Sequence, residues 1–170
     1  MYRIKFNILR IERRREIYNC ILNNPGLHLG EISRKLEIPK STLYYHLNFL
    51  EKYGFIVKRE NGRYVHYYIT NNIGEEDKKI IGLLRQEMPY KIILYLFSNP
   101  ESCQRKISRH LNRHPTTIAF HLEKLDNLET LDKHPIGNKI QYKLRDSNYL
   151  TKLLMKYNSN FLYDISKYNL

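Results

Sequence analysis

The sequence predicts a mainly α-helical fold with small β hairpins, in which two similar domains follow each other along the chain. Three observations support this class: a repeat at a fixed offset of 75 residues, apolar residues at helical spacing, and an Asn-Gly pair between two β-prone runs. We expect the domains to span residues 1–72 and 89–145, joined by a helix over 73–88 and followed by a C-terminal helix over 146–170.

The repeat appears without a gap when the chain is compared with itself at an offset of 75 residues. Between positions 24–69 and 99–144, 13 of the 46 pairs are identical, and self-similarity of this kind indicates a repeated structural unit. Chance similarity between short basic helices explains it less well, because the register continues through helices and hairpin alike. The identical pairs include Ser33/Ser108, Thr42/Thr117, His46/His121, Leu47/Leu122, Lys58/Lys133 and Tyr67/Tyr142.

The first two helices of the first copy are predicted from apolar spacing and from residues that end helices. A helix over 10–22 has Ile17 and Ile21 four positions apart, hence on one face. The Asn-Pro-Gly sequence at 24–26 ends it. A short second helix is expected over 29–36, followed by a tight connection at 37–39.

A third helix is predicted over 40–53. Leu43, Leu47 and Leu50 recur at the spacing of a buried helical stripe. Ser41 and Thr42 are residue types that cap helix starts, and a glycine at position 54 suits the end of the helix.

The period changes after this helix, and a hairpin is expected. Residues 55–59 and 64–69 are β-prone, and Asn61-Gly62 lies between them. Asn and Gly accept the positive φ angles that tight hairpin turns require. Helix, helix, turn, helix and hairpin is the order of a winged helix-turn-helix domain, whose hairpin is called the wing.

The second copy repeats these elements. We expect a helix over 89–97, a short helix over 105–111 and a third helix that starts at Thr116 and Thr117. A hairpin over 131–144 should follow, with its turn near Gly137-Asn138. Pro135 should lie on an edge strand or near the turn, because it cannot donate a ladder hydrogen bond.

The remaining segments are predicted as helices. Residues 75–88 start with three acidic side chains, which suit a helix N-terminus. Asp146 or Ser147 can cap the C-terminal helix. Its apolar stripe fits either its own domain or a homodimer partner, and both alternatives stay open: Leu150, Leu153, Leu154, Tyr157 and Phe161.

The charge of the chain indicates a polyanionic partner. The chain carries 29 Lys and Arg against 17 Asp and Glu, a net charge of +12, which suits nucleic acid or an anionic membrane surface. No apolar run approaches the roughly 18 residues of a membrane span, and the N-terminal residues do not have the pattern of a signal peptide. Two isolated cysteines, each expected in an apolar helical pattern, fit a reducing cytoplasm. The spacing of Cys103, His110 and His114 matches no standard zinc signature.

The outward residues of these elements indicate double-stranded DNA. We expect the helix over 40–53 to enter the major groove, since its outward side chains are polar, aromatic or cationic. The wing over 57–69 is expected on the backbone or minor groove. An ordinary polar surface is the alternative. The candidate contacts are Arg13, Arg14, Lys40, Ser41, Thr42, Tyr44, Tyr45, Asn48, Lys52, Lys58, Arg59 and Arg63, with Thr116, Thr117, Phe120 and Lys124 in the second copy.

The two copies differ in charge. Residues 1–72 carry 13 basic and 6 acidic residues, net +7, whereas residues 73–145 carry 13 and 9, net +4. Glu123 and Asp126 lie on or near the third helix of the second copy and oppose a phosphate. We therefore expect the first copy to dominate DNA binding. The second would bind more weakly or contact a protein.

Several motifs together carry a family resemblance over residues 10–145. They are Arg15-Glu16-Ile17-Tyr18, Asn24-Pro25-Gly26-Leu27-His28, Glu31-Ile32-Ser33-Arg34, Ser41-Thr42-Leu43-Tyr44-Tyr45-His46-Leu47, Asn61-Gly62-Arg63-Tyr64 and Leu84-Arg85-Gln86-Glu87-Met88-Pro89. The chain thereby resembles archaeal transcriptional regulators with two tandem winged helix-turn-helix domains, related to the MarR and ArsR repressors. The resemblance implies a sequence-specific regulator and does not decide between activation and repression. ArsR relatives bind metals through cysteine-rich motifs, which this sequence lacks.

An enzyme, a protein-interaction module and an RNA-binding protein are the alternative classes of function. The sequence contains no Gly-rich nucleotide motif, no metalloprotease motif and no persuasive carboxylate pair, so we expect neither an enzyme nor a cofactor. A winged-helix protein-interaction module in a transcription or replication assembly is the main alternative, which would include contact with the transcription machinery. RNA binding through aromatic stacking is a further alternative.

Overall fold

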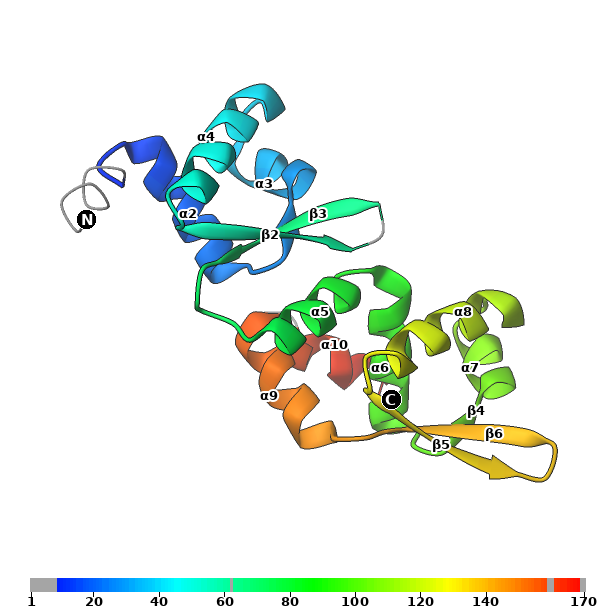
Figure 1. Cartoon of the computed structure of the whole chain (residues 1–170). Helices are drawn as coiled ribbons and strands as arrows, with labels where there is room; N and C mark the ends of the chain where they lie inside the picture. Colours follow the sequence, from blue (N-terminus) through cyan, green and yellow to red (C-terminus); the bar gives the residue numbers. More distant parts are fainter. Residues whose placement is uncertain (1–8, 62, 159–160, 169–170) are drawn as a thin grey trace. The chain divides into compact units, whose positions relative to one another are not determined.

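The computed structural model describes residues 9–61, 63–158 and 161–168 (Figure 1). The chain divides into two compact units, Met1–Gly82 and Leu83–Leu170, here called the first and second unit. Each is mainly helical with one small antiparallel sheet of three strands.

The first unit places three helices against a hairpin. Its sheet has the order β1-β3-β2, and Lys58 of β2 pairs with Tyr67 of β3. The elements are α2 (Glu12–Asn23), β1 (Leu27–His28), α3 (Leu29–Leu36), α4 (Lys40–Lys52), β2 (Ile56–Asn61) and β3 (Tyr64–Ile69), followed by α5 (Glu75–Leu84).

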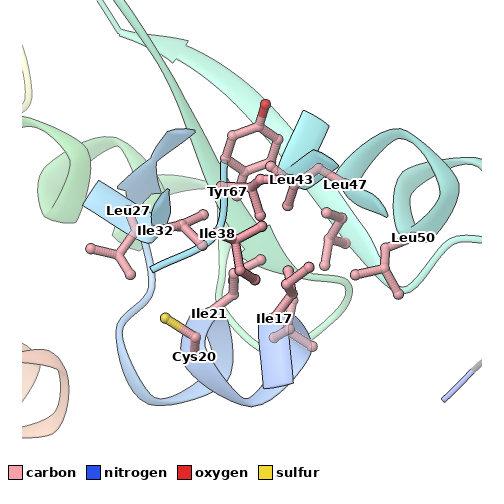
Figure 2. Packing of buried hydrophobic residues seen from close by; sticks show 12 residues of the cluster. Ile17, Cys20, Ile21, Leu27, Ile32, Ile38, Leu43, Leu47, Leu50 and Tyr67 are labelled. Atoms are coloured by element: carbon pink, nitrogen blue, oxygen red, sulfur yellow. The ribbon is translucent and has the colours of Figure 1, made fainter. Parts of the chain in front are cut away.

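The core of the first unit lies where these helices meet the hairpin. Leu43, Leu47 and Leu50 of α4 are 0% exposed, which confirms the predicted buried stripe. Figure 2 shows them together with Ile17 and Ile21 of α2 around one apolar centre. Burial of each such side chain contributes about 1.5–3 kcal/mol, so this core holds α4 in place. In α2 the buried residues include Cys20, while Ile11 and Leu22 at its ends are exposed.

The helix α4 begins at Lys40, as predicted, but its cap differs from the prediction. Ser41 and Thr42 were expected to cap the helix, but it begins at Lys40 with Pro39 as N-cap and without a side-chain cap bond. The Leu43 N–H donates to the Pro39 carbonyl at 2.9 Å. Proline disfavours helical geometry in the preceding residue, Ile38, and Pro39 itself has a non-helical ψ of 139°, so the helix starts at Lys40. Ser41 and Thr42 therefore lie in the first turn.

The second unit repeats the strands of the first at the predicted offset. Each of β4, β5 and β6 begins and ends 75 residues after β1, β2 and β3, and the sheet order β4-β6-β5 matches. The elements are α6 (Glu87–Ser98), β4 (Ser102–Cys103), α7 (Gln104–His110), α8 (Pro115–Asp126), β5 (Leu131–Ile136), β6 (Lys139–Leu144), α9 (Ser147–Tyr157) and α10 (Phe161–Tyr168).

The hairpin predictions hold where the structure describes them. Gly137 has φ +56° in the turn between β5 and β6, and Pro135 lies on the edge strand β5. In the first hairpin, β2 and β3 flank the predicted Asn61-Gly62 turn, whose glycine lies outside the described residues. Cys103 belongs to β4 instead of a helix.

The repeated serine has a structural role in both units. The Ser33 hydroxyl donates to the Ile38 carbonyl at 2.7 Å, and the Ser108 hydroxyl donates to the Arg113 carbonyl. Both bonds close the turn before the third helix. Glu37 and Asn112 in these turns have φ of +55° and +49°. Both units have a serine at this position because both contain the same turn.

The linking helix is shorter than predicted. We expected a helix over 73–88, whereas α5 ends at Leu84 and α6 begins at Glu87. Pro89 explains the break: it lies in the first turn of α6, where its missing N–H leaves no intrahelical bond unmade. In a helix continuous from α5, it would lie in the interior and break the ladder.

The C-terminal segment is two helices instead of the single helix predicted over 146–170. The Asp146 side chain accepts from the Tyr149 N–H and caps α9. Asn158 then leaves helical geometry, with φ −131° and ψ 102°. Leu150, Leu153, Leu154 and Phe161 are buried, and Phe161 lies 5.6 Å from the Phe97 ring of α6. The predicted apolar stripe therefore packs on its own unit.

Candidate nucleic-acid interface

Helix α4 presents the predicted polar and aromatic face to solvent. The buried leucines hold one side of this helix of 13 residues, which leaves the other side free. All seven candidate residues of the helix are exposed: Lys40, Ser41, Thr42, Tyr44, Tyr45, Asn48 and Lys52. An α-helix fits the major groove of DNA, and these side chains offer hydrogen bonds to base edges and positive charge to phosphates.

Two large tyrosines stand out on this face. Tyr44 is 55% exposed and Tyr45 is 60% exposed. The Tyr45 ring meets the His46 ring edge-on at 5.4 Å. Their phenol groups offer hydrogen bonds, and their rings offer apolar contact, to a surface that lies against α4.

His46 belongs to the helix packing rather than to the exposed face. It is half-buried, and burial, followed by the charges of Arg14 and Arg13, lowers the pKa of its imidazole. The equivalent His121 is also half-buried, and its pKa is lowered by burial and then by Lys124. Both rings are therefore mainly neutral at pH 7.

Arg14 was predicted as a DNA contact, but the structure places it below the surface. It is only 7% exposed, and its guanidinium lies 3.5 Å from the centre of the Phe49 ring. This cation–π contact with α4 holds the side chain below the surface, so a phosphate cannot meet it. Arg13 remains exposed and forms an ion pair with Glu16 at 3.0 Å.

Two cations of the wing are already paired with carboxylates. The Lys58 ammonium lies 3.1 Å from a Glu51 carboxylate oxygen. Arg59 donates two hydrogen bonds of 3.0 Å to Glu75, the first residue of α5. Arg63, directly before the return strand β3, is exposed. The wing therefore presents less free positive charge than its sequence suggests.

Glu75 was not predicted as part of the site. Its carboxylate also accepts from the Lys78 ammonium at 2.7 Å. The hydrogen bonds from Arg59 and then Lys78 lower the pKa of Glu75 to about 2. It stays ionised at neutral pH and competes with any phosphate for Arg59. Only its place at a helix start was visible in the sequence, whereas the pairing depends on how α5 returns beside the wing.

The equivalent face of the second unit is less cationic. Thr116, Thr117 and Phe120 are exposed on α8. Lys124 is half-buried, with its ammonium 4.3 Å from the centre of the Phe120 ring. At the positions that correspond to Lys40 and Lys52, this unit has Pro115 and Asn127.

The described residues form neither a metal site nor a helix that could span a membrane. Within residues 9–61, 63–158 and 161–168, no group of three or more His, Cys, Asp or Glu side chains is arranged to hold a metal ion. Over the same residues, no helix has the length and apolar character needed to cross a bilayer.

The geometry of the first unit agrees with a known family of domains. The model of the winged helix-turn-helix DNA-binding family matches residues 12–57, from the start of α2 into β2. Over these residues, the first unit is therefore winged-helix-like. Over 140 residues, the chain is 38% identical to an uncharacterised HTH-type transcriptional regulator of Methanocaldococcus jannaschii. The aligned part covers 82% of this chain and 35% of the relative, so the chain spans about a third of the relative's length.

Two solved structures share a more limited likeness. Reduced HlyU from Vibrio cholerae is 32% identical, with a TM-score of 0.37 over 48% of this chain and 82% of that one. An ArsR-like transcriptional regulator from Rhodococcus is 18% identical, with a TM-score of 0.41 over 54% of this chain and 88% of that one.

Proposed function

We propose that this protein is a sequence-specific transcription regulator that binds double-stranded DNA and places α4 in the major groove. The observation that carries the proposal is the exposed face of α4. Three buried leucines hold the helix, while two tyrosines, an asparagine and two terminal lysines project outward. This combination supplies groups for bases and phosphates on one element of the correct width.

The hairpin of β2 and β3 would contact the DNA backbone or the minor groove. Arg63 is available directly. Lys58 and Arg59 would exchange their carboxylate partners for phosphates on binding. Because the Arg59–Glu75 pair is exposed to solvent and the Lys58–Glu51 pair is partly exposed, that exchange costs little free energy.

The two units would form tandem winged helix-turn-helix domains joined by α5, with the first dominating DNA binding. Lys40 and Lys52 support this asymmetry, since Pro115 and Asn127 replace them in the second unit. The half-buried Lys124 supports it further. The proposed location is the cytoplasm, together with the DNA.

The salt dependence of binding tests this function. Neutralised phosphates release counterions, so the logarithm of affinity falls linearly with the logarithm of salt concentration. We expect a steep slope for duplex DNA in a fluorescence anisotropy titration. Undetectable or salt-independent binding would instead favour a protein-interaction module in a transcription or replication assembly.

Glu75→Gln is expected to raise duplex affinity about two- to fivefold, the range set by exposed ion pairs. The change removes the negative charge and one of the two acceptor oxygens that hold Arg59, which makes the guanidinium more available to phosphate. Glu76→Gln is the matched control, because Glu76 also starts α5 but pairs with Lys79. Equal affinities of the two variants in anisotropy titrations would show that Glu75 does not restrain the wing.

A homodimer through the C-terminal segment remains a proposal. The buried stripe of α9 serves its own unit, so a partner would meet the outward residues of α10. Leu162 and Tyr163 are 59% and 64% exposed. We expect Leu162→Glu with Tyr163→Glu to reduce the mass in light scattering to that of one chain, 20.6 kDa. The control is Lys152→Glu on α9. A wild-type mass of one chain, or an unchanged mass in the double variant, would contradict this role of α10.

A further inference from the structure

The second unit contains an open pocket between α7, the start of α8 and β6. Its volume is about 460 Å³, within the usual range of sites for small molecules. Pro115, Ile140 and Tyr142 provide apolar walls, while Cys103, Arg105 and Lys139 line the polar part. The Gln104 side-chain amide donates to the Pro115 carbonyl at 2.8 Å and ties α7 to α8 beside the pocket.

At the corresponding positions, the first unit has two stacked aromatic rings. There, His28 and Tyr64 stack at 4.6 Å with an angle of 13° between their planes. Gly30 leaves room for this arrangement, because a Cβ atom at that position would lie 3.0 Å from His28 Cε1. At an offset of 75, the three positions are Cys103, Lys139 and Arg105. The second unit thus lacks the ring stack and carries two cations in its place.

The polar part of the pocket favours negative charge. Arg105 and Lys139 are both exposed, and the described residues that line the pocket include no carboxylate. Backbone N–H groups of Lys106 and then Arg105, with the charges of Lys139 and Lys106, lower the pKa of the Cys103 thiol against the opposing effect of burial. An anionic group would therefore find hydrogen-bond donors and uncompensated positive charge.

We propose that this pocket binds a small anionic molecule whose carboxylate or phosphate group meets Arg105 and Lys139 and whose apolar body lies against Pro115, Ile140 and Tyr142. The apolar walls distinguish such a ligand from a DNA backbone phosphate, which has no comparable body. Pro115 is followed by Thr116, a candidate DNA contact. Occupation of the pocket therefore places the ligand next to the outward face of α8.

Cys103 makes the charge preference measurable without a known ligand. Its alkylation by the anionic iodoacetate and by the neutral iodoacetamide can be followed by peptide mass spectrometry. Cys20, the other cysteine, is only 7% exposed and should react slowly. Relative to free cysteine, we expect the ratio of the iodoacetate rate to the iodoacetamide rate to be raised about threefold or more by the local cations. Arg105→Gln with Lys139→Gln should remove this excess. Lys35→Gln with Lys152→Gln removes the same charge from exposed positions outside the pocket lining and should preserve it.

Protection of Cys103 then tests the size and chemistry of the ligand. Phenyl phosphate at millimolar concentration should slow alkylation by iodoacetamide, and inorganic phosphate or benzyl alcohol should protect less. A parallel measurement with duplex DNA distinguishes a small phosphate ligand from a phosphate of the DNA backbone. The proposal is overturned if the two pocket substitutions leave the rate ratio unchanged, if inorganic phosphate protects as well as phenyl phosphate, or if only duplex DNA protects. DNA binding by the first unit can fail or succeed independently of each result.

Discussion

Lys40→Ala combined with Lys52→Ala is expected to weaken duplex binding on the order of 50-fold at 0.1 M salt, because each lost phosphate contact costs roughly one power of the salt concentration. The two lysines are the first and last residues of α4, and both are exposed. They would meet phosphates where the helix enters and leaves the groove. Anisotropy titrations at several salt concentrations should show a slope reduced by about two.

Lys124→Ala measures the contribution of the second unit. Its ammonium is held over the Phe120 ring on a half-buried side chain, so we expect a much smaller loss of affinity. Losses equal to those caused by the changes in α4 would contradict the proposed dominance of the first unit. A small loss at Lys40 and Lys52 would contradict the proposed seat of α4 in the groove.

Leu47→Ala is expected to destabilise the first unit by about 3 kcal/mol, within the range for buried leucine truncations. Leu47 is 0% exposed and lies in the core between α2, α4 and the hairpin (Figure 2). The cavity left by the truncated side chain loosens the contact that positions α4. Hydrogen exchange by mass spectrometry should show faster opening of amides in the first unit, by about 100-fold for this free energy.

Two control variants distinguish core packing from a general effect. Leu122→Ala changes the equivalent buried residue of α8, which is 2% exposed, and should destabilise the second unit instead. Tyr45→Ala removes a 60% exposed ring from α4 and should change stability by less than about 0.5 kcal/mol. Unchanged exchange in Leu47→Ala would contradict the assigned core.

Much of the fold could be predicted because its signals are local. The 3-and-4 spacing of Leu43, Leu47 and Leu50 identified the buried side of α4, and that side determines which residues face outward. The offset of 75 located the second hairpin, whose strands match those of the first. The start of α6 was less accurate: the helix was expected from Pro89 but begins at Glu87, because a proline is tolerated anywhere in the first turn of a helix.

The errors in the candidate site come from contacts between distant segments. A helical pattern does not show that Arg14 lies under α4, because that depends on the Phe49 ring. Likewise, Arg59 and Glu75 are 16 positions apart and meet only when α5 returns beside the wing. The lining of the second unit's pocket includes Cys103, Arg105 and Lys139. None of these residues indicates a binding site by itself, and their role becomes visible only by comparison with His28, Gly30 and Tyr64 of the first unit.

Selection of bound sequences from random duplex DNA tests the central claim most directly. Purified full-length chain is incubated with the pool at moderate salt, and bound DNA is amplified and sequenced over several rounds. A variant with Lys40→Ala and Lys52→Ala serves as control. The proposed function predicts that the wild-type chain enriches a defined sequence and that the variant enriches it far less. Failure of the wild-type chain to enrich any sequence would contradict a sequence-specific DNA-binding regulator.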